Sequence, residues 1–94
     1  MILHGAVRDL IRERGLADAS LKPALLRVLA ALQHDPKRFP KKSGPLRDAR
    51  AAKLRFRGAA WRLVFTLDEE RRAVKVLALG PHDRAYAEAE RRLS

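Results

Sequence analysis

The 94-residue sequence contains no cysteine, and this absence excludes several kinds of protein. A chain without thiols forms no disulfides, has no thiolate ligands for zinc and has no cysteine nucleophile. Long hydrophobic runs are also missing, since no apolar stretch approaches the roughly 20 residues needed to cross a bilayer. The amino terminus reaches Arg8 and Asp9 before any signal-like segment develops. We therefore expect a cytoplasmic protein that does not bind membranes.

Residues that would form common metal and catalytic sites are scarce as well. His4 and His34 have no ligand-like spacing to each other or to acidic residues. Ser20 and Ser43 lack the partners of a nucleophilic triad, and Gly80 by itself does not form a phosphate-binding loop. The sequence therefore predicts neither a metal site nor a cofactor.

The positive charge of the chain is concentrated in one segment. Its length and its 47% hydrophobic content suffice for one compact domain, which we place over residues 1–94. Of the net charge of +10, residues 37–62 hold +9, from ten cations and one acid, while residues 1–36 hold +1 and residues 63–94 hold zero. Such a block is typical of a surface that binds nucleic-acid phosphates, although an acidic protein would be attracted by the same charges.

Hydrophobic periodicity predicts two helices in the first third of the chain. Apolar residues three and four positions apart indicate a helix over residues 6–14, with Gly15 as its terminator. A second apolar stripe, preceded by Ser20 as the N-cap, indicates a helix that ends before Asp35. The basic segment from Asp35 to about Arg50 contains three prolines and has no predicted regular structure.

Alternation of apolar and polar residues predicts strands in the remainder of the chain. The strands are expected over residues 53–57, 61–67 and 74–79, with turns at 58–60 and 68–72. Asp83 is the expected cap of a terminal helix. The order of elements predicts an α+β fold, with two N-terminal helices packed on a three- to four-stranded antiparallel sheet and a short C-terminal helix.

The predicted hairpin separates apolar side chains from cationic ones. If the apolar residues face the helices, Lys53, Arg55 and Arg57 lie on the opposite face, and strand pairing brings Arg62 beside them. Like charges side by side cost stability, so this set favours a bound anion. The alternative is the solvated face of a half-exposed sheet, and the hairpin residues alone leave the two readings balanced. The adjoining basic loop favours the binding face.

Two residues near the end of the last strand are candidates for chemistry. His82 lies between strand and helix, where functional groups are common, and histidine transfers protons near neutral pH. Tyr86 can point back toward the sheet and stack on a base. Taken singly, His82 also fits an ordinary loop histidine and Tyr86 a core residue. Trp61 alternates in phase with its apolar neighbours and is expected in the core.

The segment KLRFRGAAWRLVFTLDEERRAVKVLALGPHDRAYAEAERRL resembles the carboxy-terminal half of RelE/ParE superfamily toxins of bacterial toxin–antitoxin systems. The preceding LLRVLAALQHDP and PLRDAR resemble that family's second helix and its connection into the sheet. The resemblance covers about Val7 to Leu93 and implies a RelE-like fold. Members of the family open with a full strand, which only Met1 to Leu3 can supply here, so an open sheet edge is expected.

The RelE branch of this family implies a ribosome-dependent, metal-independent endoribonuclease that cuts mRNA. Lys53 and Arg55 match the family's paired basic residues, and Arg62 matches the arginine after the aromatic residue of the next strand. His82 takes the position of the general acid, and Tyr86 that of the tyrosine that orients or stacks on the substrate. Because Arg55 replaces a lysine and arginine does not readily lose a proton, any lysine-derived base would be Lys53.

Further cations are expected to hold the RNA backbone. Arg57 is an additional phosphate contact by its predicted place on the hairpin. Lys41, Lys42, Arg47 and Arg50 in the basic loop are expected to bind phosphates and guide the protein onto ribosomal RNA.

The sequence therefore predicts the toxin of a type II toxin–antitoxin system that inhibits translation by cleaving mRNA. The expected partners are mRNA, the ribosome and an acidic antitoxin, which forms a hetero-oligomer with the toxin and neutralises its cationic face. Two alternatives stay open. One is a ParE-like protein that inhibits DNA gyrase by binding, and the other is a catalytically degenerate basic domain that binds RNA.

Overall fold

The computed structural model describes residues 2–17 and 20–93. The chain begins with the short strand β1 (Ile2–Leu3) and continues through helices α1 (Gly5–Ala17) and α2 (Leu21–His34). Two 3₁₀ turns, η1 (Pro36–Arg38) and η2 (Gly44–Leu46), lie in the basic loop. The strands β2 (Arg50–Phe56), β3 (Ala59–Asp68) and β4 (Ala73–Pro81) follow, and β4 leads directly into α3 (His82–Leu93).

The four strands form one sheet in the order β1-β4-β3-β2. The pairs β2–β3 and β3–β4 are antiparallel, which confirms the predicted α+β fold. β1 runs parallel to β4 and pairs with Lys75 and Val76 alone. Met1, which the sequence analysis included in this strand, lies outside the described residues. Within the described part of the chain, the edge of β4 beyond Val76 therefore has no neighbouring strand.

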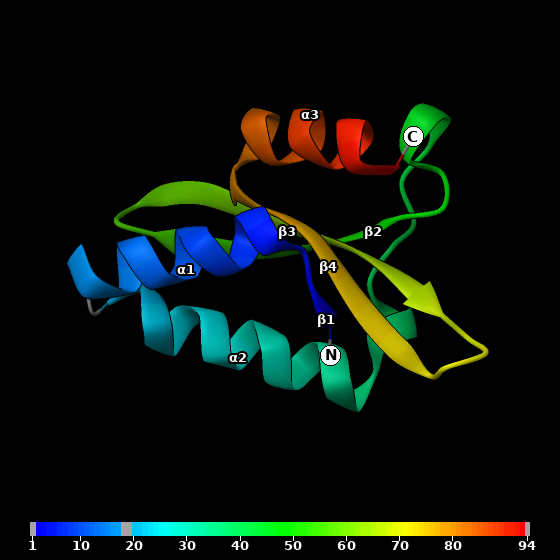
Figure 1. Cartoon of the computed structure of the whole chain (residues 1–94), viewed down its shortest axis with the longest axis horizontal. Coiled ribbons are helices and arrows are strands. Elements are labelled where there is room, and N and C mark those ends of the chain that lie inside the picture. Colours follow the sequence, from blue (N-terminus) through cyan, green and yellow to red (C-terminus); the bar gives the residue numbers. More distant parts are fainter. Residues whose placement is uncertain (1, 18–19, 94) are drawn as a thin grey trace.

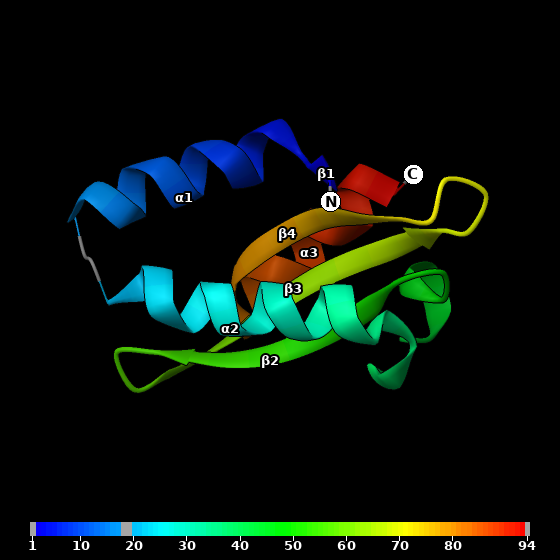
Figure 2. The same ribbon diagram turned by 90° about the horizontal axis from the view of Figure 1, so that it is seen from below.

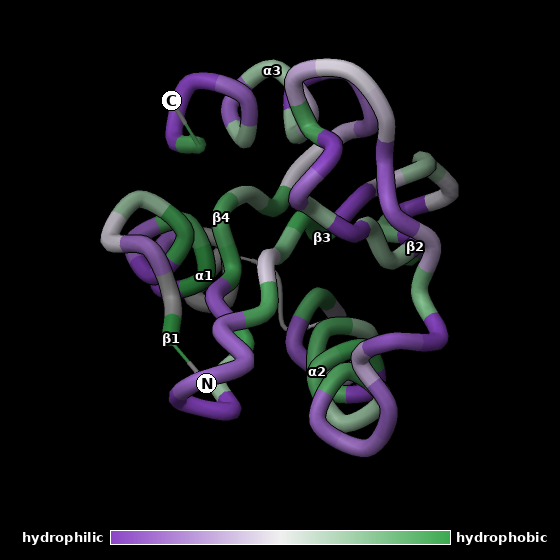
Figure 3. The backbone as a smooth tube through the Cα atoms, turned by 90° about the vertical axis from the view of Figure 1, so that its right-hand side faces the viewer, coloured by the Kyte–Doolittle hydropathy of each residue, from purple (hydrophilic) through white to green (hydrophobic). Residues whose placement is uncertain are grey.

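The helices cover both faces of the sheet. α1 and α2 lie side by side on one face, and α3 crosses the other face (Figures 1 and 2). Figure 3 shows hydrophobic residues along β4 and on the two N-terminal helices, where these layers meet. Among the described residues, no helix combines the length and the apolar content that a membrane span requires.

The period of two along β3 divides the core between these two faces. Trp61, Leu63 and Phe65 are buried together with the apolar stripes of α1 and α2, so the prediction that Trp61 belongs to the core is confirmed. Val64 faces the other way and packs with a smaller cluster beneath α3, formed by Leu46, Ala49, Leu77, Ala78, Ala85 and Ala89. The second cluster contains four alanines, and their small side chains let α3 approach the sheet closely.

Two predicted helix boundaries are wrong. α1 continues through Gly15 to Ala17, because a glycine inside a helix costs only about 1 kcal/mol and does not by itself end it. α3 begins at His82, so Asp83 lies in its first turn and does not precede the helix. An acid in the first turn is still favourable there, since it interacts with the positive end of the helix dipole.

The turn between β2 and β3 also differs from the prediction. Arg57 and Gly58 both adopt positive φ angles, 54° and 76°, and form a two-residue turn between Phe56 and Ala59. Turns of this kind join antiparallel strands well because their twist matches that of the strands, and glycine adopts the conformation without strain. Residues 59–60 therefore belong to β3, and Arg57 belongs to the turn and not to the strand.

Candidate nucleic-acid interface

Lys53 and Arg62 lie directly opposite each other on β2 and β3. They are in phase with Val64, which packs under α3, so both side chains lie on the α3 side of the sheet. Counting back from the two-residue turn places them in a pair without backbone hydrogen bonds, where the Cα atoms of antiparallel strands are only about 4.5 Å apart. Lys53 is exposed, and Arg62 is half-buried and donates through Nη1 to the Trp61 carbonyl (3.0 Å).

Gly80 extends this row onto β4, because it is the partner of Arg62 across the β3–β4 pair. A methyl group placed on Gly80 would have no other part of the protein within 4 Å, apart from the adjoining residues of the chain. The glycine therefore leaves a small hollow beside Arg62, at the point where the chain turns into α3. A side chain at this position would occupy that space.

His82 and Tyr86 lie one turn apart at the start of α3. Their rings meet edge to face, with centroids 4.8 Å apart and an interplanar angle of 86°. Nδ1 of His82 lies 2.7 Å from Oδ1 of Asp83. A carboxylate only accepts hydrogen bonds, so Nδ1 is the protonated nitrogen in this contact and Nε2 remains available to a ligand. The direct passage from β4 into α3 thus places Tyr86 in contact with His82.

The basic loop reaches this site through Lys42. Its Nζ lies 4.7 Å from the centroid of the Tyr86 ring, and its backbone N–H donates to the Ala49 carbonyl (2.9 Å). Nothing in the spacing of the sequence pointed to this contact, because Lys42 and Tyr86 are 44 positions apart and belong to different elements. The hollow at Gly80 was missed for a similar reason, since it depends on the register between β3 and β4.

Arg55 and Arg57 occupy different surroundings, although both were predicted to lie beside Lys53. Arg55 is exposed on the same face, two residues from Lys53, and donates through Nη1 to the Gly58 carbonyl (3.0 Å). Arg57 lies in the turn, with its guanidinium 5.9 Å from the Phe56 ring, which belongs to the core under α1 and α2. The prediction that Arg57 shares the face of Lys53 is therefore wrong, because the turn removes it from the strand alternation.

The other predicted phosphate-binding residues of the loop are dispersed. Arg50 is in phase with Ala52 and faces the α2 side, where Nη1 donates to the carbonyls of Phe39 (2.7 Å) and Lys37 (3.1 Å). Its guanidinium therefore holds the loop together. Lys41 is exposed opposite Arg50, and Arg47 is exposed just after η2.

The cations of the sheet face have no neutralising acid. Within residues 2–17 and 20–93, none of Lys53, Arg55 and Arg62 forms an ion pair with an Asp or Glu. The acids that do form ion pairs lie mainly in the β3–β4 turn and on α3. This surface is therefore positively charged, which suits an anionic ligand.

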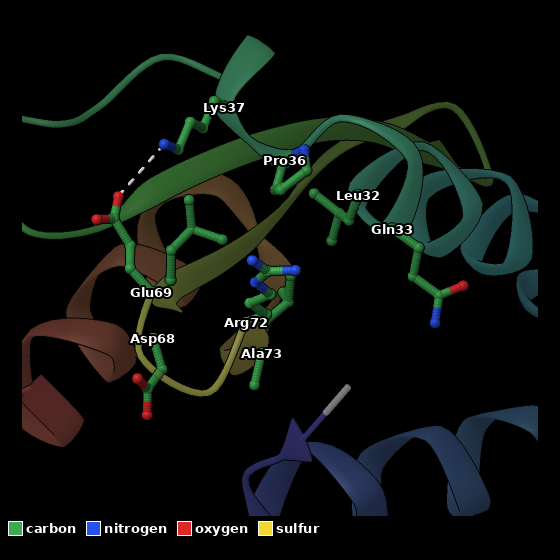
Figure 4. A pocket seen from close by; sticks show the side chains of 10 residues that line it. Leu32, Gln33, Pro36, Lys37, Asp68, Glu69, Arg72 and Ala73 are labelled. Carbon is green, nitrogen blue, oxygen red and sulfur yellow. Dashed lines mark ion pairs between the residues drawn. The ribbon is translucent and has the colours of Figure 1, made fainter.

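A pocket lies elsewhere, between the end of α2 and the β3–β4 turn (Figure 4). It has a volume of about 590 Å³ and an apolar floor that includes Leu32 and Val74. Lys37 and Glu69 form an ion pair across it, with Nζ and Oε1 3.4 Å apart. The pocket reaches β3 at Leu67 and Asp68, five and six residues along the strand from Arg62, which corresponds to about 17–20 Å. No metal-binding group of three histidine or acidic residues occurs among the residues described.

We take the cationic surface, and not this pocket, as the candidate site. The reason is chemical: within the described part of the chain, Lys53 and Arg62 form no ion pair with an acid. His82 and Tyr86 begin the helix that follows Gly80, the strand partner of Arg62. The pocket offers an apolar floor, and two of its charged lining residues, Lys37 and Glu69, are paired with each other.

Comparison with known proteins gives one match. The family model described as "ParE-like toxin of type II bacterial toxin-antitoxin system" matches residues 8–90, from α1 to near the end of α3. Searches of the curated proteins and of the solved structures found no significant match.

Proposed function

The chain belongs to the ParE-like toxins of type II bacterial toxin–antitoxin systems, and we propose that it acts by cleaving mRNA on the ribosome and thereby inhibits translation. The observation that supports this proposal is the pairing of Lys53 with Arg62 on neighbouring strands, where neither cation forms an ion pair with an acid among the described residues. A type II toxin has a cognate antitoxin as its partner. We propose that the antitoxin is acidic and binds in a hetero-oligomer that covers these cations.

The proposed reaction is attack of an RNA 2′-hydroxyl on the adjacent phosphate. A bond forms between the 2′-oxygen and phosphorus, and the bond from phosphorus to the 5′-oxygen breaks, leaving a 2′,3′-cyclic phosphate and a 5′-hydroxyl. Lys53, in its neutral form, accepts the proton of the 2′-hydroxyl, and His82, in its protonated form, gives a proton to the 5′-oxygen. Arg55 and Arg62 stabilise the charge that builds up on the phosphorane oxygens.

The surrounding residues position this reaction. Tyr86 holds the His82 ring edge-on, and Asp83 holds Nδ1, so that Nε2 is the nitrogen that meets the 5′-oxygen. The hollow over Gly80 gives the phosphate room beside Arg62. Exposed loop cations such as Lys41 and Arg47 add attraction toward ribosomal RNA.

The role of the cations is tested with purified toxin, translating ribosomes and a reporter mRNA. Arg62→Ala is expected to lower the rate of mRNA cleavage by roughly 100-fold or more, as the loss of one oxyanion contact does in other enzymes. Arg12→Ala, which removes an exposed cation from α1, is the matched control and should retain activity. Full cleavage by Arg62→Ala would contradict the proposal.

The role of His82 as an acid is tested with a modified substrate. His82→Gln should cleave ordinary RNA slowly, because the 5′-oxygen leaves poorly without a proton. An RNA in which sulfur replaces the 5′-bridging oxygen has a leaving group that needs no proton, so His82→Gln should cleave it nearly as fast as the unaltered protein does. Arg62→Ala should stay slow on both substrates. Equal loss on both substrates for His82→Gln would rule out the acid role.

A second candidate function is inhibition of DNA gyrase by binding, and the ParE-like description of the matching family favours it. A supercoiling assay separates the two proposals. Inhibition of supercoiling by toxin that leaves mRNA intact on translating ribosomes would favour the second function, and cleavage of mRNA without an effect on supercoiling would favour the first.

A further inference from the structure

The pairing of Lys53 with Arg62 places a primary amine beside a guanidinium on the sheet surface. The two residues lie opposite each other on β2 and β3, and the Cβ atoms of such pairs are about 4.5–5.5 Å apart. Lys53 is exposed, and it forms no ion pair with an acid within the described part of the chain. Its amine is therefore open to reagents from solution.

The guanidinium of Arg62 can hold a phosphate group beside this amine. Nη1 donates to the Trp61 carbonyl, and a guanidinium has further N–H groups that bind phosphate oxygens through parallel hydrogen bonds. Gly80, the strand partner of Arg62, leaves space there, because a methyl group on it would meet no part of the protein within 4 Å other than the adjoining residues. Arg55, exposed on the same face, adds a second cation. A phosphate group bound to Arg62 lies within reach of the Lys53 side chain.

One class of phosphate compound reacts with amines directly, namely the acyl phosphates. In these compounds an acyl group is bonded to a phosphate oxygen, and inorganic phosphate is a good leaving group. If Arg62 holds the phosphate group, the acyl carbon comes next to the amine of Lys53, and holding two reactants together raises the rate of their reaction. The neighbouring cations also stabilise the charge that builds up on the departing phosphate.

We propose that Lys53 is a modification site that acyl phosphates acylate, with Arg62 as the residue that binds their phosphate group. The neutral amine of Lys53 attacks the acyl carbon, and a carbon–nitrogen bond forms. The bond from the acyl carbon to the phosphate oxygen breaks, and inorganic phosphate leaves with the electron pair of that bond. The proton displaced from the nitrogen passes to solvent. The product is an amide, which has neither a positive charge nor a basic nitrogen.

This modification switches off the proposed ribonuclease. An acylated Lys53 does not accept the proton of the 2′-hydroxyl and does not attract a phosphate. This consequence rests on the proposed function, and the rate of mRNA cleavage should fall in proportion to the acylated fraction of Lys53. The acylation itself requires no RNA, so it is measured separately.

The test compares two acetyl donors, acetyl phosphate and acetic anhydride, of which the first alone carries a phosphate group. Proteolysis before each aspartate releases residues 48–67, with Lys53 as their single lysine, and residues 18–34, with Lys22 as theirs. Mass spectrometry of the two peptides gives both acetylation rates in one sample. Lys22 is exposed on α2 and is the internal control. With acetyl phosphate, Lys53 should react about 10-fold or more faster than Lys22. With acetic anhydride, the two rates should be similar.

The role of Arg62 is tested by substitution and by competition. Arg62→Ala should lower the rate at Lys53 by about 10-fold or more with acetyl phosphate, as the loss of a hydrogen bond from a charged group does, and should leave the rate with acetic anhydride nearly unchanged. Arg12→Ala, which removes an exposed cation from α1, is the matched control and should change neither rate. Inorganic phosphate competes for Arg62, so in the unaltered protein it should slow the reaction of acetyl phosphate at Lys53 and not at Lys22.

The outcomes separate the modification site from the proposed reaction. Equal rates at Lys53 and Lys22 with acetyl phosphate, or an equal effect of Arg62→Ala with both donors, would overturn the site. Selective acetylation of Lys53 in a protein that cleaves no mRNA would support the site and refute the proposed reaction. Full mRNA cleavage after complete acetylation of Lys53 would overturn both the switch and the role of Lys53 as the base.

Discussion

Arg50 shows how one residue fixes the shape of the basic loop. Its guanidinium donates to two backbone carbonyls, those of Phe39 and Lys37, at 2.7 and 3.1 Å. Hydrogen bonds from a charged group stabilise a protein by about 1.5–3 kcal/mol, so Arg50→Ala should lower the free energy of unfolding by about that amount. For a domain of this size, each kcal/mol corresponds to roughly 4–8 °C in Tm, which a thermal melt followed by circular dichroism measures.

Arg47→Ala is the control for this prediction, since Arg47 is an exposed cation of the same loop. Its effect on stability should stay within about 0.5 kcal/mol. If Arg50→Ala leaves Tm unchanged but weakens RNA binding strongly, Arg50 acts as a phosphate contact and not as a brace for the loop.

Single residues also show where sequence reasoning succeeds. The alternation of β2 and β3 was enough to place Lys53 and Arg62 on one face, because side-chain direction in a strand follows a strict period of two. Arg57 was misplaced because its direction depends on the type of turn, and the positive φ at Arg57 depends on how the two strands close. Lys42 was expected to bind phosphates, but its contact with Tyr86 depends on the docking of α3, which no local pattern records.

At the scale of elements, α3 is held to the sheet by Arg92. The register between β3 and β4 shifts at Val64 and Phe65, so Leu77 has no partner opposite it. Arg92 Nη1 donates to the Leu77 carbonyl at 2.6 Å, and its Nη2 lies 3.6 Å from Glu88. Arg92→Ala should therefore destabilise the docked helix by about 1–3 kcal/mol. Hydrogen exchange should quicken at the α3 amides more than at those of α2.

The control for the docking of α3 is Arg84→Ala. Arg84 also pairs with Glu88 on α3, at 3.2 Å, but it is exposed and, among the described residues, donates no hydrogen bond to a strand carbonyl. Exposed pairs contribute about 0–1 kcal/mol, so the amides of α3 should exchange at nearly their original rates. Equal quickening in both variants would indicate that Glu88, and not the Leu77 carbonyl, holds the helix.

The elements themselves were largely predictable, because the stripes of α1 and α2 and the apolar run of β4 have clear periods. The residues at which these helices and strands begin and end were less predictable. β2 begins at Arg50, inside the segment that was expected to be loop, since its residues pair with β3 as far as Phe65. The side of the sheet on which α3 packs was not predicted either, because the alanines of its buried face carry little hydrophobic signal.

At the scale of the whole molecule, the charge of +10 is divided between two kinds of cation. Some are engaged inside the fold or with acids, as Arg50 is with the loop and Lys37 is with Glu69. Others lie on the α3 side of the sheet and form no ion pair with an acid among the described residues, namely Lys42, Lys53, Arg55 and Arg62. The sequence count alone does not distinguish them, because it weighs every cation of the basic block equally.

This division predicts how strongly RNA binding depends on salt. Each phosphate neutralised on a single strand contributes about −0.7 to the slope of log K against log salt concentration. Four cations beside α3 give a slope of about −2.8, whereas contact by all ten cations of residues 37–62 would give about −7. Titration of a 2′-O-methyl RNA of about 20 nucleotides over a range of KCl concentrations measures the slope.

Lys53→Ala should reduce the magnitude of this slope by about 0.7. Lys37→Ala should leave the slope unchanged, because Lys37 is paired with Glu69 at the far end of the sheet. A slope near −7, or equal reductions for the two variants, would mean that RNA is held by the basic block as a whole and not by the surface beside α3.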